Sequence, residues 1–377
     1  MKKVAFGLIV LCCFMSVTCF ALAATQPWQI GSTGYDTLQD AVKAASSGDV
    51  ITMTQNTTGS ADIGNENGTQ PKSLTIDLGG YTLTQRPAVG STGTVTNGMR
   101  VLANSSLTIR NGVIQCGEAG GNIKVGIANY GTLALTDVRM LSGPDVWYTI
   151  NNRGNLTLSG STSVETGKAV KKIAITNDPY NYIYTNTNAT LTITDPRVTV
   201  GVVQAELYGN SQNKGNVDMR ISAGTIAEVK DDGNNSLTPI AGITGGAYGK
   251  PVDSRFVQNG TSSIQVSGDS STPYYLGASA TQRMAQAKSG DVIQVLQASS
   301  TALTLPAGVK VINQSGQTLK VNGQSLIAGG SLVVPAAPAA AIPDMPKTGD
   351  ETPLALLLGL LLGSALLGVG FWKKQRA

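Results

Sequence analysis

Few side chains in this sequence could carry acid–base or nucleophilic chemistry. The 377 residues include no histidine, which excludes a Ser-His-Asp triad, a Cys-His dyad and a His-ligated zinc site. No EF-hand spacing or repeated Gly-Asp calcium pattern is present. The remaining candidates for general acid–base work are carboxylates and arginines near turns and strand ends: Asp178, Asp195, Asp231, Asp232, Arg110, Arg139 and Arg153.

The run around Asp231 and Asp232 reads Lys-Asp-Asp-Gly-Asn-Asn, which is the composition of a solvated turn. The sequence therefore favours a protein with no catalytic residue, no metal and no cofactor. An enzyme that works through carboxylates is the alternative.

Aromatic residues give a stronger prediction for binding. Trp147 and Tyr148, followed by Tyr180, Tyr182 and Tyr184, fall in irregular segments near the middle of the chain. The three later tyrosines alternate, so a strand would place them on one face, and exposed aromatic rings stack well on sugar rings. The alternative is that these rings pack loops against the body of the protein. Nucleic-acid binding is not expected, because no basic stripe is present.

The composition favours an all-β body that could position such residues. Glycine contributes 45 residues, only 13% of the chain is charged, and Thr, Asn and Ser are plentiful. Short apolar strands flanked by turn residues recur along the chain: residues 74–76, 107–109, 133–135, 156–158 and 191–193, with 217–219 and 264–266 as weaker copies. Residues 127–135 align with residues 150–158 without a gap and share the pattern Ile-x-Asn-x-Gly-x-Leu-x-Leu. Val101, Ala103, Ser105 and Leu107 repeat the inward positions one step earlier.

The two copies are offset by 23 residues (150 minus 127). A repeat of this length, with no helical spacing inside it, predicts a solenoid of strands. Each coil would bury its Leu and Ile face against its neighbours, and Thr and Asn at the alternate positions would face water. Loops are expected where the spacing widens, between Leu74 and Leu107 and between Leu156 and Leu191. We predict a right-handed parallel β-helix, with a β-sandwich as the alternative.

A short capping helix is predicted at the start of this body. Leu38, Ala41, Val42 and Ala45 share one helical face, and Gly48 ends the helix before a strand. Residues 35–51 resemble the opening of pectate-lyase-like β-helix proteins, and residues 243–260 resemble a phrase that ends β-helix modules on bacterial surface proteins. The resemblance covers about residues 30–325. It implies a fold and a location on the bacterial surface, but no particular reaction.

The opening phrase recurs at residues 284–293, where it predicts a small closing unit. The strands of this unit are expected at Leu303, Leu305, Val309, Val311, Leu319 and Val321.

The N-terminus has the three parts of a secretory signal. Lys2 and Lys3 precede an apolar stretch, and Ala21-Leu22-Ala23 fits the small-x-small rule, so cleavage is expected after Ala23. Removal of residues 1–23 leaves Cys116 as the only cysteine of the mature chain. With no partner thiol and no histidine to activate it, Cys116 is expected to be a small buried hydrophobic residue.

The C-terminus carries a second signal. Met345-Pro346-Lys347-Thr348-Gly349 is followed by an uncharged run over residues 353–372 and a basic tail. This order resembles the LPxTG cell-wall sorting signal of Gram-positive bacteria, with Met345 in place of the usual Leu. The resemblance implies that a sortase cleaves after Thr348 and joins it to the peptidoglycan cross-bridge. A permanent transmembrane anchor is the alternative.

Together these features predict five segments: a signal peptide (1–23), a β-helix domain (24–270), a closing β unit (271–332), a Pro/Ala linker (333–344) and a sorting signal with its transmembrane helix (345–377). The expected protein is secreted, passes through the plasma membrane and ends on the Gram-positive cell wall. Its β-helix would bind a glycan or a host surface ligand without catalysis. The alternatives are a polysaccharide lyase or hydrolase and a purely structural wall protein.

Overall fold

The computed structural model describes residues 26–91, 94–179, 188–208, 215–234 and 236–336. In these ranges the chain is predominantly β, with a large and mostly parallel sheet and two helices. None of the helices found there is long and apolar enough to cross a membrane. The apolar run over residues 353–372 lies outside the described ranges.

The elements have the following bounds. The helices are α1 (Leu38–Ala44) and α2 (Gly277–Ala285). The strands are β1 (Trp28–Ile30), β2 (Thr33–Tyr35), β3 (Val50–Met53), β4 (Thr57–Thr58), β5 (Ala61–Ile63), β6 (Ser73–Asp77), β7 (Thr82–Thr84), β8 (Asn97–Val101), β9 (Ser106–Cys116), β10 (Val125–Asn129), β11 (Thr132–Ser142), β12 (Tyr148–Asn152), β13 (Asn155–Ser159), β14 (Ser163–Val164), β15 (Ile173–Asn177), β16 (Ala189–Ile193), β17 (Thr199–Ala205), β18 (Val217–Ile221), β19 (Thr225–Asp231), β20 (Gly245–Tyr248), β21 (Ser263–Ser267), β22 (Tyr274–Leu276), β23 (Val292–Gln297), β24 (Ala302–Leu303), β25 (Lys310–Asn313), β26 (Leu319–Val321), β27 (Gln324–Leu326) and β28 (Ser331–Val333).

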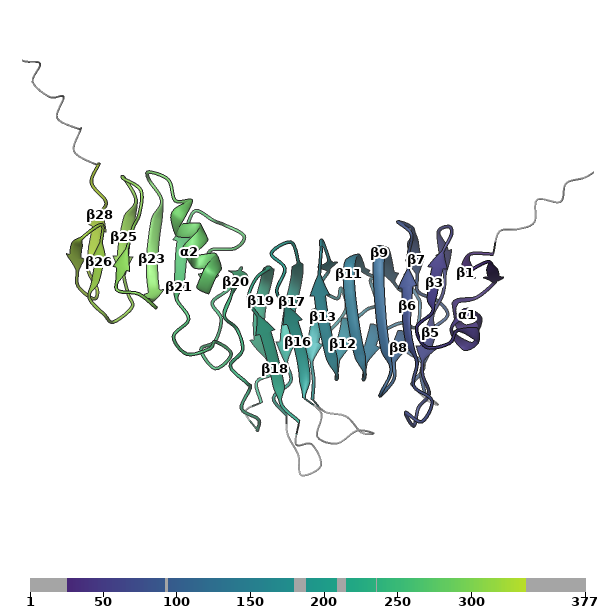
Figure 1. The fold of residues 1–377 in the computed structure, drawn as a ribbon. Helices are drawn as coiled ribbons and strands as arrows, with labels where there is room; N and C mark the ends of the chain where they lie inside the picture. The colour runs from purple at the N-terminus through teal and green to yellow at the C-terminus, as the bar shows by residue number, and fades with distance from the viewer. Residues whose placement is uncertain (1–25, 92–93, 180–187, 209–214, 235, 337–377) are drawn as a thin grey trace, which may run out of the picture.

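The parallel strands form three ladders that run along the body (Figure 1). Ladder one contains β3, β6, β13, β16, β18 and the first halves of β9 and β11. Ladder two contains β4, β7, β14, β20, the second halves of β9 and β11 and the first halves of β17 and β19. Ladder three contains β5, β8, β10, β12, β15 and the second halves of β17 and β19.

Each ladder presents an unbroken column of buried apolar side chains. In ladder one the column consists of Leu74, Leu107, Leu133, Leu156, Leu191 and Met219. Burying one such side chain contributes about 1.5–3 kcal/mol, but each coil can bury its column only on the coils beside it. The predicted strands at residues 74–219 are therefore confirmed, and the architecture is compatible with an all-β solenoid.

The predicted inward positions Val101, Ala103, Ser105 and Leu107 are all buried, as expected. Cys116 is also fully buried, as predicted, and this burial raises the pKa of its thiol.

The prediction that asparagines at alternate positions face water is wrong at one corner of the coil. Asn129, Asn152 and Asn177, at the ends of β10, β12 and β15, are fully buried and stacked in register. The Asn129 amide nitrogen donates to Asn152 Oδ1 at 2.7 Å, and the Asn152 amide nitrogen donates to Asn177 Oδ1 at 2.6 Å. We call these three residues the asparagine ladder.

The asparagine ladder also satisfies main-chain groups at the turn that follows each strand. Asn129 and Asn152 donate to the carbonyl oxygens of Asn155 and Thr190, both at 3.0 Å. Their Oδ1 atoms accept from the amides of Gly131 and Gly154. A buried amide group that lost these partners would be costly, so the interactions hold successive coils in one register.

Helix α1 covers the N-terminal end of the body, as predicted (Figure 1). Its buried residues are Leu38, Ala41 and Val42, and the Thr37 hydroxyl accepts from the Asp40 amide at the first turn. At the other end, the Lys72 ammonium donates to three carbonyl oxygens of the last turn, including those of Val42 and Ala45, both at 2.6 Å. Gly48 has a positive φ of 99°, as a chain reversal after the helix requires.

The parallel ladders stop at β20. Strand β22 pairs antiparallel with β20 on one side and with β21 on the other. The weaker repeat copy at residues 264–266 therefore does not belong to ladder one, because β21 pairs only with β22 and β23. Most buried apolar residues from Ile264 to Val334 form a second hydrophobic cluster, to which α2 contributes Ala280 and Met284, whereas Leu276 belongs to the first.

The strands expected in this closing region are present at Leu303, Val311, Leu319 and Val321. Leu305 and Val309 are buried but lie outside strands, after β24 ends and before β25 begins.

Candidate functional site

A column of polar side chains lies directly beyond the asparagine ladder, where the chain leaves ladder three. The main-chain amides of these residues bond to the coil before: Arg153 N to Asn129 O (2.7 Å), Asp178 N to Asn152 O (2.8 Å), Glu206 N to Asn177 O (3.0 Å) and Asp232 N to Ala205 O (3.0 Å). In the same way, Tyr130 N donates to Val101 O at 2.7 Å, so Tyr130 precedes Arg153 in the column. We call Tyr130, Arg153, Asp178, Glu206 and Asp232 the corner column. Neighbouring residues in it belong to adjacent coils, about 4.8 Å apart.

Arg153 and Asp178 form a largely buried ion pair in the corner column. Arg153 Nη2 lies 2.8 Å from Asp178 Oδ2, and the two side chains are 17% and 11% exposed. The Arg153 guanidinium carbon also lies 5.7 Å from the centre of the Tyr130 ring. The arginine is thereby held between an aromatic face and a carboxylate, and the ion pair orients Asp178.

Glu206 has a different environment from Asp178. Its Oε1 accepts hydrogen bonds from Gln204 Nε2 at 2.7 Å and from Thr176 Oγ1 at 3.2 Å. Burial raises the pKa of the Glu206 carboxyl, the charges of Asp178 and Asp232 raise it further, and these two hydrogen bonds oppose the rise. The corner column therefore combines an aspartate paired with an arginine and a glutamate that holds its proton to higher pH.

The hydroxyl of Tyr148 is influenced by the same charged side chains. Tyr148 begins β12, is half-buried, and pairs in register with Val125 and Ile173. Burial, together with the charges of Glu206 and Asp178, raises the pKa of its hydroxyl to about 12, and the charge of Arg153 opposes that rise. The preceding residue, Trp147, is 37% exposed, which makes it one of the few large apolar side chains open to solvent.

The structure thus brings together several residues that the sequence singled out separately. Arg153, Asp178 and Asp232 lie at one corner of adjacent coils, and the charges of Arg153 and Asp178 act on the hydroxyl of Tyr148, which begins β12. Trp147 adjoins Tyr148 in the chain. Tyr180, Tyr182 and Tyr184, which follow Asp178, lie outside the described residues, and so do Ala23 and the motif Met345, Pro346, Lys347, Thr348 and Gly349.

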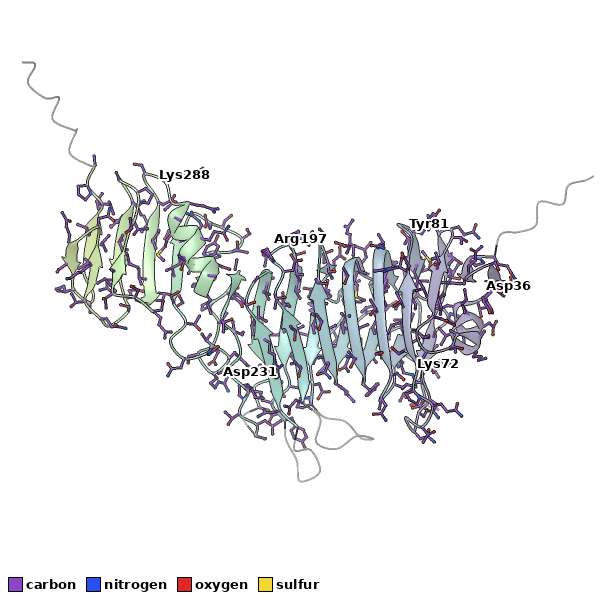
Figure 2. All side chains as sticks on the ribbon, viewed as in Figure 1. Asp36, Lys72, Tyr81, Arg197, Asp231 and Lys288 are labelled. Carbon is purple, nitrogen blue, oxygen red and sulfur yellow. The ribbon has the colours of Figure 1, made fainter. Side chains whose placement is uncertain are left out.

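The other acid–base candidates lie in local ion pairs and turns. Asp195 bonds to Arg197 at 2.8 Å and accepts from the Gly160 amide, Arg110 pairs with Asp77 at 2.8 Å, and Arg139 is 4.0 Å from Glu165. Figure 2 shows Arg197 and Asp231 on opposite edges of the body. Asp231 accepts from the Gly233 amide and pairs with Arg255, as a turn residue does.

Sequence reasoning missed Glu206. It follows Ala205, and its match to Asp178 depends on the pairing of β17 with β15 across a loop of irregular length. The only sequence signal was a carboxylate just after a strand end. Among the described residues, no group of three or more His, Cys, Asp or Glu side chains could hold a metal ion.

Comparison of the chain with protein-family models, with curated proteins and with solved structures gives no match. The chemistry of the corner column is therefore the guide to function. Its carboxyl groups can accept hydrogen bonds from hydroxyl groups, and the exposed ring of Trp147, just before β12, offers a face for a sugar ring.

We predict that Glu206→Gln makes the protein more stable than the unmodified chain at pH 7. A carboxyl group whose pKa is raised by folding binds its proton more tightly in the folded state, so its contribution to stability falls as pH rises above the unfolded pKa. The advantage of the variant should shrink as pH falls towards 4. Urea unfolding at both pH values measures this difference.

Glu228→Gln is the matched control, because Glu228 lies on β19 away from the corner column. An advantage of Glu206→Gln that does not change with pH, or a loss of stability at both pH values, would contradict the assignment of a raised pKa.

Proposed function

We propose that this chain is a secreted surface protein of Gram-positive bacteria that a sortase anchors to the cell wall. In this proposal its right-handed parallel β-helix, capped by α1, binds a glycan at the corner column. The sorting motif and the signal sequence support the location. The three parallel ladders, which share β9, β11, β17 and β19, support successive coils of one helix.

The observation that carries the binding proposal is that Arg153, Asp178 and Glu206 meet at one corner and that their charges reach the Tyr148 hydroxyl. Trp147, which precedes Tyr148 in the chain, supplies an exposed ring. Glycan recognition needs hydrogen-bond acceptors and donors held in fixed directions, together with an aromatic face. The ion pair orients Asp178, and the bonds from Gln204 and Thr176 orient Glu206. The hydroxyl of Tyr148 stays protonated at neutral pH and can donate.

A second candidate function, polysaccharide cleavage, is favoured by one specific observation. Glu206 has a raised pKa, whereas its neighbour Asp178 is paired with Arg153. A carboxyl group with a raised pKa, beside a second carboxyl group that is paired with an arginine, suits a general acid and its carboxylate partner.

A binding and cleavage assay separates these functions. We expect the full chain to bind at least one member of a panel of wall and host glycans in titration calorimetry. Glu206→Gln should weaken that binding about tenfold or more, because a hydrogen bond to a charged group is lost, whereas Glu228→Gln should not. Release of reducing ends or unsaturated products by the unmodified chain, abolished in Glu206→Gln, would instead establish the second candidate. Absence of binding across the panel would contradict both and favour a structural wall protein.

The anchoring proposal has its own test. In Gram-positive cells, mass spectrometry of muramidase-released wall fragments should show a chain that ends at Thr348 and is joined to a cross-bridge. Thr348→Ala should abolish this product, since Thr348 would supply the acyl group. Lys347→Ala is the matched control, because that position is free in the motif. Peptides containing intact Trp372 in the membrane fraction of unmodified cells would contradict sortase anchoring.

A further inference from the structure

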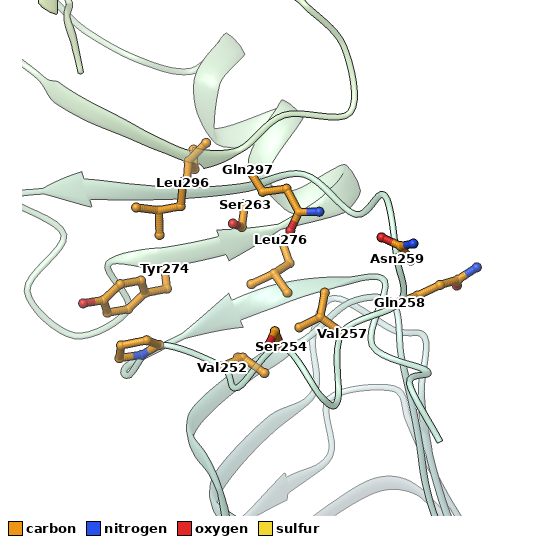
Figure 3. A pocket seen from close by; sticks show the side chains of 12 residues that line it. Val252, Ser254, Val257, Gln258, Asn259, Ser263, Tyr274, Leu276, Leu296 and Gln297 are labelled. Carbon is orange, nitrogen blue, oxygen red and sulfur yellow. The ribbon is translucent and has the colours of Figure 1, made fainter. Parts of the chain in front are cut away.

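A cavity lies where the last parallel ladder meets the closing region. It has a volume of about 410 Å³ and is formed by the loop over residues 251–259 on one side and by β21, β22 and β23 on the other (Figure 3). Its apolar wall includes Val252, Val257, Leu276 and the ring of Tyr274, and Asn259 and Gln297 contribute side-chain amides. We call this cavity the junction pocket. Its volume is in the range of small-molecule sites, about 300–1,000 Å³.

The loop that closes the junction pocket is held firmly. Phe256 is 1% exposed and packs in the first hydrophobic cluster. On either side of it, Ile243 N donates to Phe256 O at 3.0 Å, and Gln258 N donates to Ile243 O at 2.9 Å. Arg255 also pairs with both Asp253 and Asp231, which ties the loop to β19. The pocket is therefore preformed, and ligand binding would cost little conformational entropy in the loop.

The chemistry of the lining limits what can bind. None of the described residues that line the junction pocket is charged. In the described part of the chain, the side-chain amides of Asn259 and Gln297 make no hydrogen bond to another protein group. Figure 3 shows these two side chains at the rim of the pocket, with Leu276 between them and the Tyr274 ring. An ionic ligand would have no oppositely charged side chain to pair with. A purely apolar ligand would displace the water bound to the two amides without replacing its hydrogen bonds.

The strand pairing disfavours a peptide. A peptide that adds to a sheet needs a free strand edge. Here β22 is paired on both sides, with β20 and β21, and β23 is paired on both sides, with β21 and β25. The hydrogen-bonding groups left to a ligand in the junction pocket are therefore chiefly side-chain amides and hydroxyls.

We propose that the junction pocket binds an uncharged pyranose sugar. The C–H face of a pyranose suits the Tyr274 ring and the aliphatic wall, and its hydroxyl groups can pair with the amides of Asn259 and Gln297, each of which both donates and accepts. The proposal does not depend on glycan binding at the corner column, because the two sites share no residue.

The test is a titration of the full chain with neutral disaccharides such as cellobiose, maltose and chitobiose, followed by calorimetry. At least one should bind with a dissociation constant of about 10 mM or below. The double variant Asn259→Ala/Gln297→Ala should weaken that binding about tenfold or more. Glucuronic acid, a pyranose with a carboxylate, should bind more weakly than glucose.

Gln294→Ala is the matched control, since Gln294 lies on β23 but does not line the pocket. It should leave the affinity unchanged, and so should Glu206→Gln at the corner column. Thermal unfolding of each variant reports whether the fold is retained. If a second double variant, Val257→Ala/Asn259→Ala, is folded and binds as tightly as the unmodified chain, the proposal is wrong.

Absence of saturable binding by every neutral sugar, or binding of peptides alone, would also overturn the proposal. Loss of neutral-sugar binding in Glu206→Gln but not in Asn259→Ala/Gln297→Ala would reject the junction pocket and leave the corner column supported. The reverse pattern is the result expected for the junction pocket, and it leaves the corner column to be judged by the glycan panel described above.

Discussion

Buried amide groups at one corner of the coil set the register on which the rest of the structure depends. Asn129, Asn152 and Asn177 bond to one another and to the main chain of the next turn, out of reach of water. A slip of one residue would leave these amides unpaired, at a cost of about 1–3 kcal/mol for each group. The apolar columns of the three ladders are tolerant of small shifts by comparison, since they are made of similar aliphatic side chains. The amides therefore supply specificity and the columns supply most of the burial.

The same register produces the candidate site. Because the asparagine ladder holds the ends of β10, β12 and β15 level, the residues that follow are stacked as well, and Arg153, Asp178 and Glu206 become neighbours. The junction pocket has the opposite origin, since it lies where parallel stacking ends and β22 reverses the direction of the sheet. One site is rich in charge and the other has none, and this difference follows from their places in the fold.

Local periodicity was enough to predict much of this architecture. The strands at residues 74–219, the face of α1 with Leu38 and Val42, and the burial of Cys116 follow from spacing and residue type alone. The burial of Asn152 could not be predicted from spacing and residue type, because an asparagine before a turn is equally common in solvent. Its hydrogen-bond partners come only from the neighbouring coils. Glu206 and the antiparallel pairing of β21 likewise depend on contacts across irregular loops, which a repeat pattern cannot align.

The structural role of the asparagine ladder is tested most directly by the stability of Asn152→Ala, with Asn155→Ala as its control. Asn152 is fully buried, whereas Asn155 is exposed on the next strand. Urea unfolding should show a loss of about 2–4 kcal/mol for Asn152→Ala, since several buried groups lose their partners, and a change within about 0.5 kcal/mol for Asn155→Ala. Equal and small effects of the two substitutions would contradict a structural role for the asparagine ladder.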